Sequence, residues 1–268
     1  MPNYQVISKA SYGNKRWLRY TGYAFAMKDA VIPLTLAELP KAAMSLPIGF
    51  IAQGENFLPA AVMSLQSEKN LFVAPDGRWV QSYIPAACRS YPFILARTTE
   101  GQQVLCIDQD SGLVTEGEEG EAFFDEEGQP AKAVQDILQF LNSVEQSRQA
   151  TSAACAVLAK HKLIQPWPIA VKTDAGEQKI EGLYRIDEAA LNELPAEALV
   201  ELRNANALTI TYCQLLSMQH LGLLGELAKA HAAADAAKQA KAAKLPEVAG
   251  SLDLDFLKKS DSISFSGF

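Results

Sequence analysis

The sequence predicts an α+β protein in which a β-rich N-terminal part, made of antiparallel hairpins, packs with a helical C-terminal part. Three observations carry this prediction. Short apolar segments separated by Gly, Pro and Asp turns fill residues 1–112. Apolar residues recur at helical spacing after residue 131. The 268 residues, of which 49% are hydrophobic and 21% charged, are typical of a globular chain that buries a large core.

The N-terminal part contains several segments with the features of strands. Residues 16–28 are rich in aromatics and roughly alternate, which favours a strand. Thr35 followed by Glu38 is a capping-box pattern, so residues 35–43 are predicted to be a short helix. The other predicted strands are residues 31–34, 48–53, 57–65, 93–97 and 103–108.

Residues 70–93, termed the aromatic block, hold five aromatics, three prolines and two arginines. Pro75, Asp76 and Gly77 predict a turn, because Pro fixes one φ, Asp caps locally and Gly accepts a positive φ. The apolar side chains of the block are predicted to hold the core, namely Phe72, Ile84 and Phe93.

The period of the pattern changes after the acidic segment, residues 113–130, which is predicted to be a solvated loop. A long amphipathic helix is predicted from residue 134 towards residue 159. A hairpin should follow, in which residues 169–172 pair with residues 180–186. The remaining predicted helices are residues 188–194, residues 196–204 and a buried helix at 208–227, which the Ala-rich residues 228–244 extend.

These elements predict a single domain over residues 1–245. It consists of the β-rich residues 1–112, the acidic loop and the mainly helical residues 131–245. Residues 246–268 are predicted to be a flexible tail, in which the apolar residues 252–257 are a candidate docking segment.

Charge and hydropathy exclude several classes of protein. The net charge of −7, from 24 basic and 31 acidic residues, argues against nucleic-acid binding, which needs a dense basic face. No apolar run approaches the ~20 residues of a membrane span. The N-terminus lacks the charged and apolar regions of a signal peptide, so a cytoplasmic location is expected, with non-classical export to the cell surface left open.

The sequence contains no complete catalytic or metal-binding motif. Four cysteines are widely spaced without a C-x-x-C pair, which favours free thiols in a reducing compartment. His161, His220 and His231 are scattered, so no metal site is predicted. Nucleophile and nucleotide motifs are also missing from the pattern. We therefore predict no catalytic residue, no metal and no cofactor.

Four residues of the aromatic block are candidates for a binding surface. Trp79, Tyr83 and Tyr91 supply flat contact area, and Arg89 supplies a planar fork of donors that also stacks on rings. A structural role, in which the rings fill the core and Arg89 bonds buried oxygens, fits Trp79, Arg89 and Tyr91 equally well.

The aromatic block also carries a resemblance. Its pieces are Asn70-Leu-Phe-Val, Asp76-Gly-x-Trp79, Tyr83-Ile-Pro85 and Arg89-x-Tyr91-Pro92-Phe93. Together they resemble the bacterial SapC family. The resemblance continues in Leu163-Ile-x-Pro166-Trp167, Gly182-Leu-Tyr184-Arg-Ile-Asp187, Tyr212 with Leu216-Ser217-Met218, and Leu252-Asp-Leu-Asp-Phe256.

The resemblance implies little about activity. The family takes its name from a protein associated with a bacterial surface layer, and it is distinct from the peptide-transport permease of the same name. It brings no established catalytic residues. Its members are often encoded near flavin-dependent tryptophan halogenases and TonB-dependent receptors, which implies an accessory role in uptake or in peptide or tryptophan modification.

The leading prediction is a non-catalytic interaction protein that binds a peptide or protein partner. Two alternatives stay open. The first is an enzyme whose site assembles Arg89, Tyr91 and Asp108 in one cleft. The second is a structural protein of a surface layer. Self-association into a homo-oligomer is also left open.

Overall fold

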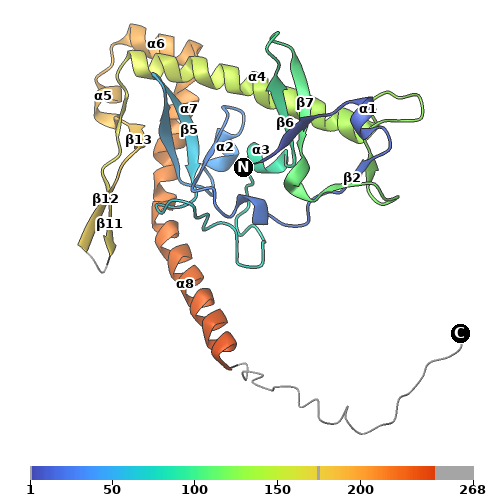
Figure 1. The fold of residues 1–268 in the computed structure, drawn as a ribbon. Coiled ribbons are helices and arrows are strands. Elements are labelled where there is room, and N and C mark those ends of the chain that lie inside the picture. The colour runs from blue at the N-terminus through green and yellow to red at the C-terminus, as the bar shows by residue number, and fades with distance from the viewer. Residues whose placement is uncertain (1, 174–175, 245–268) are drawn as a thin grey trace, which may run out of the picture. The chain divides into compact units, whose positions relative to one another are not determined.

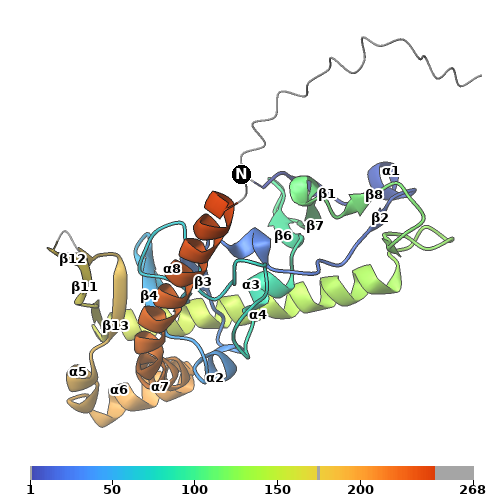
Figure 2. The same cartoon turned by 90° about the horizontal axis from the view of Figure 1, so that it is seen from below.

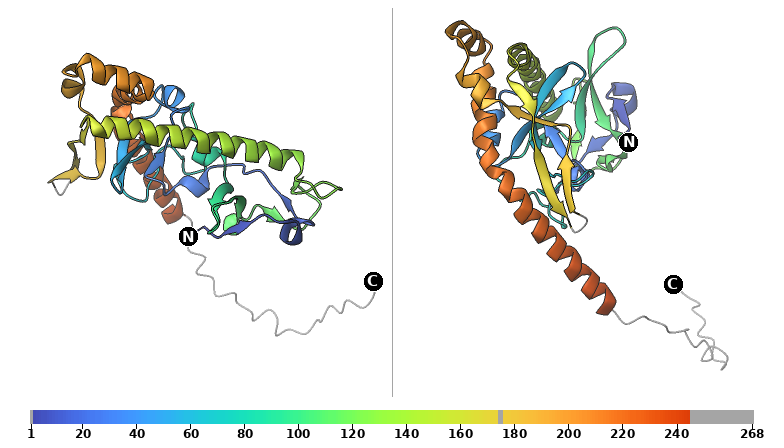
Figure 3. Two further views of the ribbon diagram at one scale, coloured as in Figure 1. Left: turned by 90° about the horizontal axis from the view of Figure 1, so that it is seen from above. Right: turned by 90° about the vertical axis from the view of Figure 1, so that its left-hand side faces the viewer.

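The longest helix, α4 (Lys132–Lys160), packs against both main β-sheets of a fold that is α+β, as predicted (Figure 1, Figure 3). The computed structural model describes residues 2–173 and 176–244. The chain divides into two units, Met1–His231 and Ala232–Phe268, and every contact discussed below lies within the first. None of the helices in the described residues is long and apolar enough to cross a membrane.

A five-stranded antiparallel sheet with the order β10-β13-β4-β5-β3 forms the larger of these sheets. Its strands are β3 (Val31–Pro33), β4 (Ile48–Gln53), β5 (Asn56–Val62), β10 (Ile164–Pro166) and β13 (Leu183–Ile186). The first three confirm predicted strands, and β4 and β5 form a hairpin. Because β10 and β13 come from the second half of the chain, this sheet joins the two halves.

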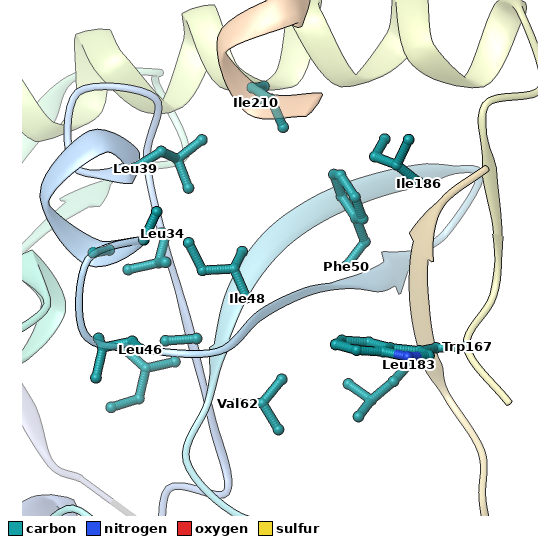
Figure 4. Packing of buried hydrophobic residues seen from close by; sticks show 14 of the residues in the cluster. Leu34, Leu39, Leu46, Ile48, Phe50, Val62, Trp167, Leu183, Ile186 and Ile210 are labelled. Carbon is teal, nitrogen blue, oxygen red and sulfur yellow. The ribbon is translucent and has the colours of Figure 1, made fainter. Parts of the chain in front are cut away.

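The main core lies around this sheet, against α2 (Leu39–Ala42), α7 (Ala207–Ser217) and the C-terminal half of α4. Phe50 is fully buried and points towards the side of the sheet on which Ile186 and Ile210 lie (Figure 4). The neighbouring Gly49 faces the other way, where a Cβ would lie 3.2 Å from the ring of Trp167. Glycine at this position therefore allows the indole to pack on the sheet.

Two buried polar side chains join α7 to the sheet. Gln214 accepts a hydrogen bond from Ile186 N (3.0 Å) and donates one to Ile48 O (3.1 Å). Ser217 Oγ accepts from Ile48 N at 3.0 Å. These bonds satisfy backbone groups that the sheet leaves unpaired, so α7 is held in one register on β4 and β13.

A second core lies beneath the N-terminal half of α4. A three-stranded sheet, ordered β1-β7-β6, comprises β1 (Tyr4–Val6), β6 (Phe93–Arg97) and β7 (Gln103–Asp108). The hairpin of β6 and β7 confirms its predicted bounds. Short helices flank this sheet, namely α1 (Lys9–Tyr12), α3 (Ala86–Arg89) and the 3₁₀ turn η2 (Gln109–Ser111). The buried side chains of this core include Tyr12, Trp17, Phe93, Phe123, Val134 and Leu141.

The predicted strand at residues 16–28 is wrong over most of its length. Only β2 (Arg16–Trp17) is a strand, and the 3₁₀ turn η1 (Ala24–Ala26) follows it after a coil. The aromatic side chains pack on one another instead, with the rings of Tyr20 and Tyr23 5.4 Å apart. Tyr23 N donates to Gly77 O at 2.7 Å, which ties the coil to the predicted Pro75–Gly77 turn. Ring packing thus replaces strand pairing here.

The prediction of a solvated acidic loop at residues 113–130 is wrong in part, because most of its acidic side chains are exposed but the segment contains two short strands. β8 (Val114–Thr115) and β9 (Glu121–Ala122) pair with β2 on its two sides. Phe123 is fully buried, with its ring 4.9 Å from that of Tyr12. Burial of this ring draws the surrounding acidic residues onto the body of the protein.

The C-terminal hairpin is shorter than predicted. β11 (Ile169–Thr173) pairs with β12 (Gly176–Ile180), so Ile180 is the one residue of the predicted partner segment 180–186 that pairs with it. Gly182 has a φ of +83°, and the chain then enters β13, which pairs with β10 and β4. The buried Leu183 and Ile186 favour this position because they join the main core there.

The predicted C-terminal helices are present with one interruption. α5 (Glu188–Asn192) and α6 (Ala196–Asn204) match their predictions closely. The predicted helix at 208–227 is broken by the 3₁₀ turn η3 (Met218–His220) between α7 and α8 (Leu221–Lys244). Ser217 Oγ donates to Gln214 O at 2.7 Å, and such local bonding competes with regular helix. The Ala-rich segment is helical as predicted, whereas residues 246–268 lie outside the described residues.

Candidate functional site

A buried carboxylate, that of Glu38, lies at the centre of the candidate site. Its Oε2 accepts from Thr35 N and Thr35 Oγ1, both at 3.0 Å. Its Oε1 accepts from Tyr83 OH at 3.0 Å and from Ala86 N at 2.6 Å. Four donors therefore stabilise one charge that is only 5% exposed, and the carboxylate joins the turn before α2 to the end of the aromatic block.

The helix predicted at residues 35–43 is present only over Leu39–Ala42. The bond from Thr35 N to the Glu38 carboxylate is half of the predicted capping box. Two hydroxyls of α4 satisfy the next backbone donors: Thr151 Oγ1 accepts from Leu36 N at 2.7 Å, and Ser147 Oγ accepts from Ala37 N at 3.0 Å. Residues 36–38 are thus held as a turn against α4.

Arg89 is exposed but held in one place. Its Nε donates to Ile84 O at 3.0 Å and its NH2 donates to Tyr83 OH at 3.3 Å. The guanidinium carbon lies 5.8 Å from the centre of the Tyr83 ring and 5.0 Å from that of Phe140 on α4. Stacking and hydrogen bonding together orient the planar fork of Arg89, and no acidic side chain among the described residues pairs with it.

Two hollows meet at Arg89. The first, termed the α4 hollow, has a volume of about 490 Å³ and lies between the turn before α2, the end of the aromatic block and the middle of α4. Figure 2 shows α3, which ends at Arg89, beside the middle of α4. The residues that line the α4 hollow include Glu38, Lys41, Ser82, Tyr83, Ile84, Arg89, Phe140 and Val144.

The second hollow, termed the Tyr91 hollow, has a volume of about 280 Å³. Trp17, Tyr20 and Tyr91 supply aromatic walls, while Arg19 and Arg89 supply charge. Arg19 pairs with Glu121 at 2.5 Å, so its charge is already neutralised. Arg89 is therefore the cation that both hollows share without an acidic partner among the described residues.

The four predicted surface residues do not all line one hollow. Tyr83 lines the α4 hollow, Tyr91 lines the Tyr91 hollow, and Arg89 lines both. Trp79 lines neither: it packs on the ring of Tyr23 at 5.6 Å, and its Nε1 donates to Tyr83 O at 2.9 Å. Trp79 thus supports Tyr83 from behind.

Tyr91 is held by ring stacking. Its ring lies 3.8 Å from that of Phe25, with 9° between the planes. Phe72 and Phe93 are fully buried as predicted, and Ile84 is half-buried beside the α4 hollow. Asp108 lines neither hollow; its Oδ1 accepts from Asn3 N (2.9 Å) and from Asp110 N (3.2 Å). Asp108 is therefore not part of either hollow that Arg89 lines.

Sequence reasoning missed three residues of the site, namely Glu38, Lys41 and Phe140. Glu38 was assigned only a local capping role, although it contacts Tyr83, 45 positions away along the chain. One feature of the sequence points to a wider role for Glu38. Its carboxylate lies between apolar residues, and a carboxylate that is buried among apolar residues needs hydrogen-bond donors from elsewhere in the chain. Lys41 and Phe140 carry no such signal.

Burial raises several pKa values in and near the site. The pKa of Tyr83 rises to about 12, because of burial and then the Glu38 carboxylate. Burial, followed by the charges of Asp29 and Glu38, raises the pKa of the Cys88 thiol to about 12. Burial does the same for Tyr20 and Cys155. As predicted, the four cysteines are free.

These shifts lead to a pH-dependent expectation. Each group holds its proton more tightly in the folded chain, so its stabilising effect is complete below the ordinary pKa values of about 8.5–10 and is lost as the pH rises towards 12. The melting temperature should therefore fall steadily above a pH of about 9. Tyr83→Phe should flatten this fall, whereas Tyr212→Phe, at an exposed position, should not. A melting temperature that stays constant up to a pH of about 11 would contradict this expectation.

Comparison with models of protein families gives a match to the family described as SapC, over residues 7–224 of the chain. The matched range contains both hollows and the whole aromatic block. Neither the curated proteins nor the solved structures gave a match.

Proposed function

Since this chain belongs to the SapC family, we propose that it is an interaction protein that binds a peptide segment of a partner across Arg89. One observation carries the proposal: an exposed, oriented guanidinium without an acidic partner among the described residues lines two adjacent hollows. A role accessory to uptake or to peptide or tryptophan modification, as the family resemblance implies, would use such a binding site.

The physical argument rests on preorganisation. Arg89 is already fixed by Tyr83, Ile84 and Phe140, so a ligand need not order it on binding. The α4 hollow falls within the range of roughly 300–1,000 Å³ that is usual for ligand sites, and its lining combines polar and charged side chains with apolar ones such as Ile84, Phe140 and Val144. The Tyr91 hollow shares Arg89 with the α4 hollow, so a ligand that extends beyond one hollow has a second one next to the same residue.

A site-specific photocrosslink tests this proposal. A benzophenone side chain replaces Ser82, which is exposed and lines the α4 hollow, and in a control protein it replaces the exposed Gln53 of β4. In extracts of the native host, the Ser82 protein should form a discrete covalent adduct, and the Gln53 protein should not. Adding Arg89→Ala to the Ser82 protein should reduce the adduct about tenfold or more, because charge-assisted hydrogen bonds are lost.

Two results would contradict the proposal. Equal adducts from positions 82 and 53 would show capture that does not depend on the site. An unchanged adduct after Arg89→Ala, in a protein whose circular dichroism spectrum is that of the parent, would show that the guanidinium is not part of the interaction. Mass spectrometry of the adduct identifies the partner and the peptide in contact.

A further inference from the structure

We propose that the α4 hollow is a carboxylate site, in which Lys41 and Arg89 together bind an acidic group of the peptide. This inference rests on the proposed function and gives the ligand its chemical class. Lys41 belongs to α2 and Arg89 to the end of α3, so the two cations reach one hollow from segments that are 48 positions apart in sequence.

The first argument is charge. Lys41 is exposed, and among the described residues neither Lys41 nor Arg89 has an ion-pair partner. Glu38 is the one acidic residue among the described residues that line the hollow. A group that enters this hollow therefore meets one carboxylate and two cations that have no ion-pair partner among the described residues, which favours an anionic ligand.

The second argument concerns Glu38, whose carboxylate is fully occupied. Both of its oxygens accept two hydrogen bonds each, two of them from backbone N–H groups. It also fixes the direction of a short chain of bonds, because Tyr83 donates its only hydroxyl proton to Glu38 and accepts from Arg89 NH2. Glu38 is therefore a positioning residue that holds Tyr83 and, through Tyr83, Arg89. Because its oxygens already accept four hydrogen bonds, it does not serve as a binding site for a cationic ligand.

The third argument is the number of donors that remain. Arg89 uses two of its five N–H groups, on Ile84 O and Tyr83 OH, and the other three have no hydrogen-bond partner among the described residues. A guanidinium binds a carboxylate through two parallel bonds, and a Lys ammonium adds a compact charge beside it. Ser82 supplies a further hydroxyl at the mouth of the hollow.

The walls of the hollow select among anions. Ile84, Phe140 and Val144 place apolar surface beside the cations, so the ligand should combine a carboxylate with an apolar stem or neighbour. An acidic peptide side chain and the carboxylate at the end of a peptide both meet this description. They share the same chemistry, and the experiment separates them.

Fluorescence polarisation with three labelled peptides tests the inference. The first has the sequence Gly-Phe-Glu-Phe-Gly with an amidated end, and the second, Gly-Phe-Gln-Phe-Gly, has a free carboxylate at its end. The third is the second peptide with an amidated end, and it is neutral. At least one of the carboxylate peptides should bind about tenfold more tightly than the neutral one. Which of the two binds more tightly identifies the source of the carboxylate.

Substitutions in the protein test whether Lys41 contributes to binding of the peptide carboxylate. Lys41→Ala should weaken binding of the preferred carboxylate peptide about three- to tenfold and leave the neutral peptide unchanged. Lys28→Ala, which removes an exposed lysine that does not line the hollow, is the matched control and should have no effect. Added salt should weaken the binding of the carboxylate peptide more than the binding of the neutral peptide.

Failure of this inference is distinct from failure of the proposed function. If Arg89→Ala weakens the binding of all three peptides while Lys41→Ala changes the binding of none, the hollow is not a carboxylate site, but the proposal that the protein binds a peptide stands. Equal binding of the neutral and carboxylate peptides leads to the same conclusion. If none of the peptides binds and position 82 captures no partner, both proposals fail.

Discussion

Replacing Glu38 with alanine is expected to lower the free energy of unfolding by about 3 kcal/mol and to abolish peptide binding. The change leaves the buried N–H groups of Thr35 and Ala86 without an acceptor, and each such group costs about 1–3 kcal/mol. Removal of a buried charge recovers part of this loss through relief of desolvation. Tyr83 would also lose the bond that positions it, and Arg89 would lose its orientation with it.

Equilibrium unfolding in urea measures the effect. Glu38→Gln should lie between wild type and Glu38→Ala, because its carbonyl oxygen still accepts while its NH2 group opposes the remaining donors. Glu55→Ala, at an exposed position in the turn between β4 and β5, is the matched control and should stay within about 0.5 kcal/mol of wild type. A Glu38→Ala protein as stable as the Glu55→Ala protein would mean that the four bonds contribute nothing net.

The second large effect is expected in the main core, at Phe50. This side chain is fully buried on β4, on the side of the sheet where Ile186 and Ile210 lie (Figure 4). Phe50→Ala removes a ring from a site that helices and strands surround, so the cavity cannot close completely. The expected loss of unfolding free energy is about 3–5 kcal/mol.

Gln53→Ala, at the exposed end of the same strand, is the control for Phe50→Ala and should change stability by less than about 0.5 kcal/mol. Both positions lie on the same strand, and Phe50 is buried whereas Gln53 is exposed. If Phe50→Ala costs less than about 1 kcal/mol, the core around β4 is looser than the structure shows. Phe50→Leu should recover much of the loss, because it refills most of the volume.

Local patterns predicted the elements that depend on local chemistry. The hairpin of β6 and β7 and the helix α4 have close to their predicted bounds, because turn residues and apolar period act over a few neighbours. The strand predicted at residues 16–28 was wrong because a local pattern cannot include contacts with distant residues. Alternating aromatics are compatible with a strand and also with rings that pack on one another, and only the contact with Gly77 and Tyr91 selects the second.

The candidate site was predicted in part. Tyr83 and Arg89 were found from the unusual composition of the aromatic block, and they do line a hollow. For Trp79 a surface role and a packing role were equally compatible with the sequence, and in the structure it packs on Tyr23 and donates to Tyr83 O. Nothing in the local sequence indicates that Lys41 and Phe140 would join Arg89, since α2 and α4 are separate segments until the sheet and the long helix bring them together.

The sequence by itself determined the α+β class, the unusual aromatic and arginine content of the aromatic block, and the residue types available for binding. The tertiary structure alone decided which of those residues are exposed and that Glu38 is buried and fully bonded. It also decided that Lys41 and Arg89, neither of which has an ion-pair partner in the part of the chain that the structure describes, share a hollow. The reason is physical. Periodicity and turn chemistry act between near neighbours, whereas burial and the pairing of charges depend on segments that meet only when the core closes around α4.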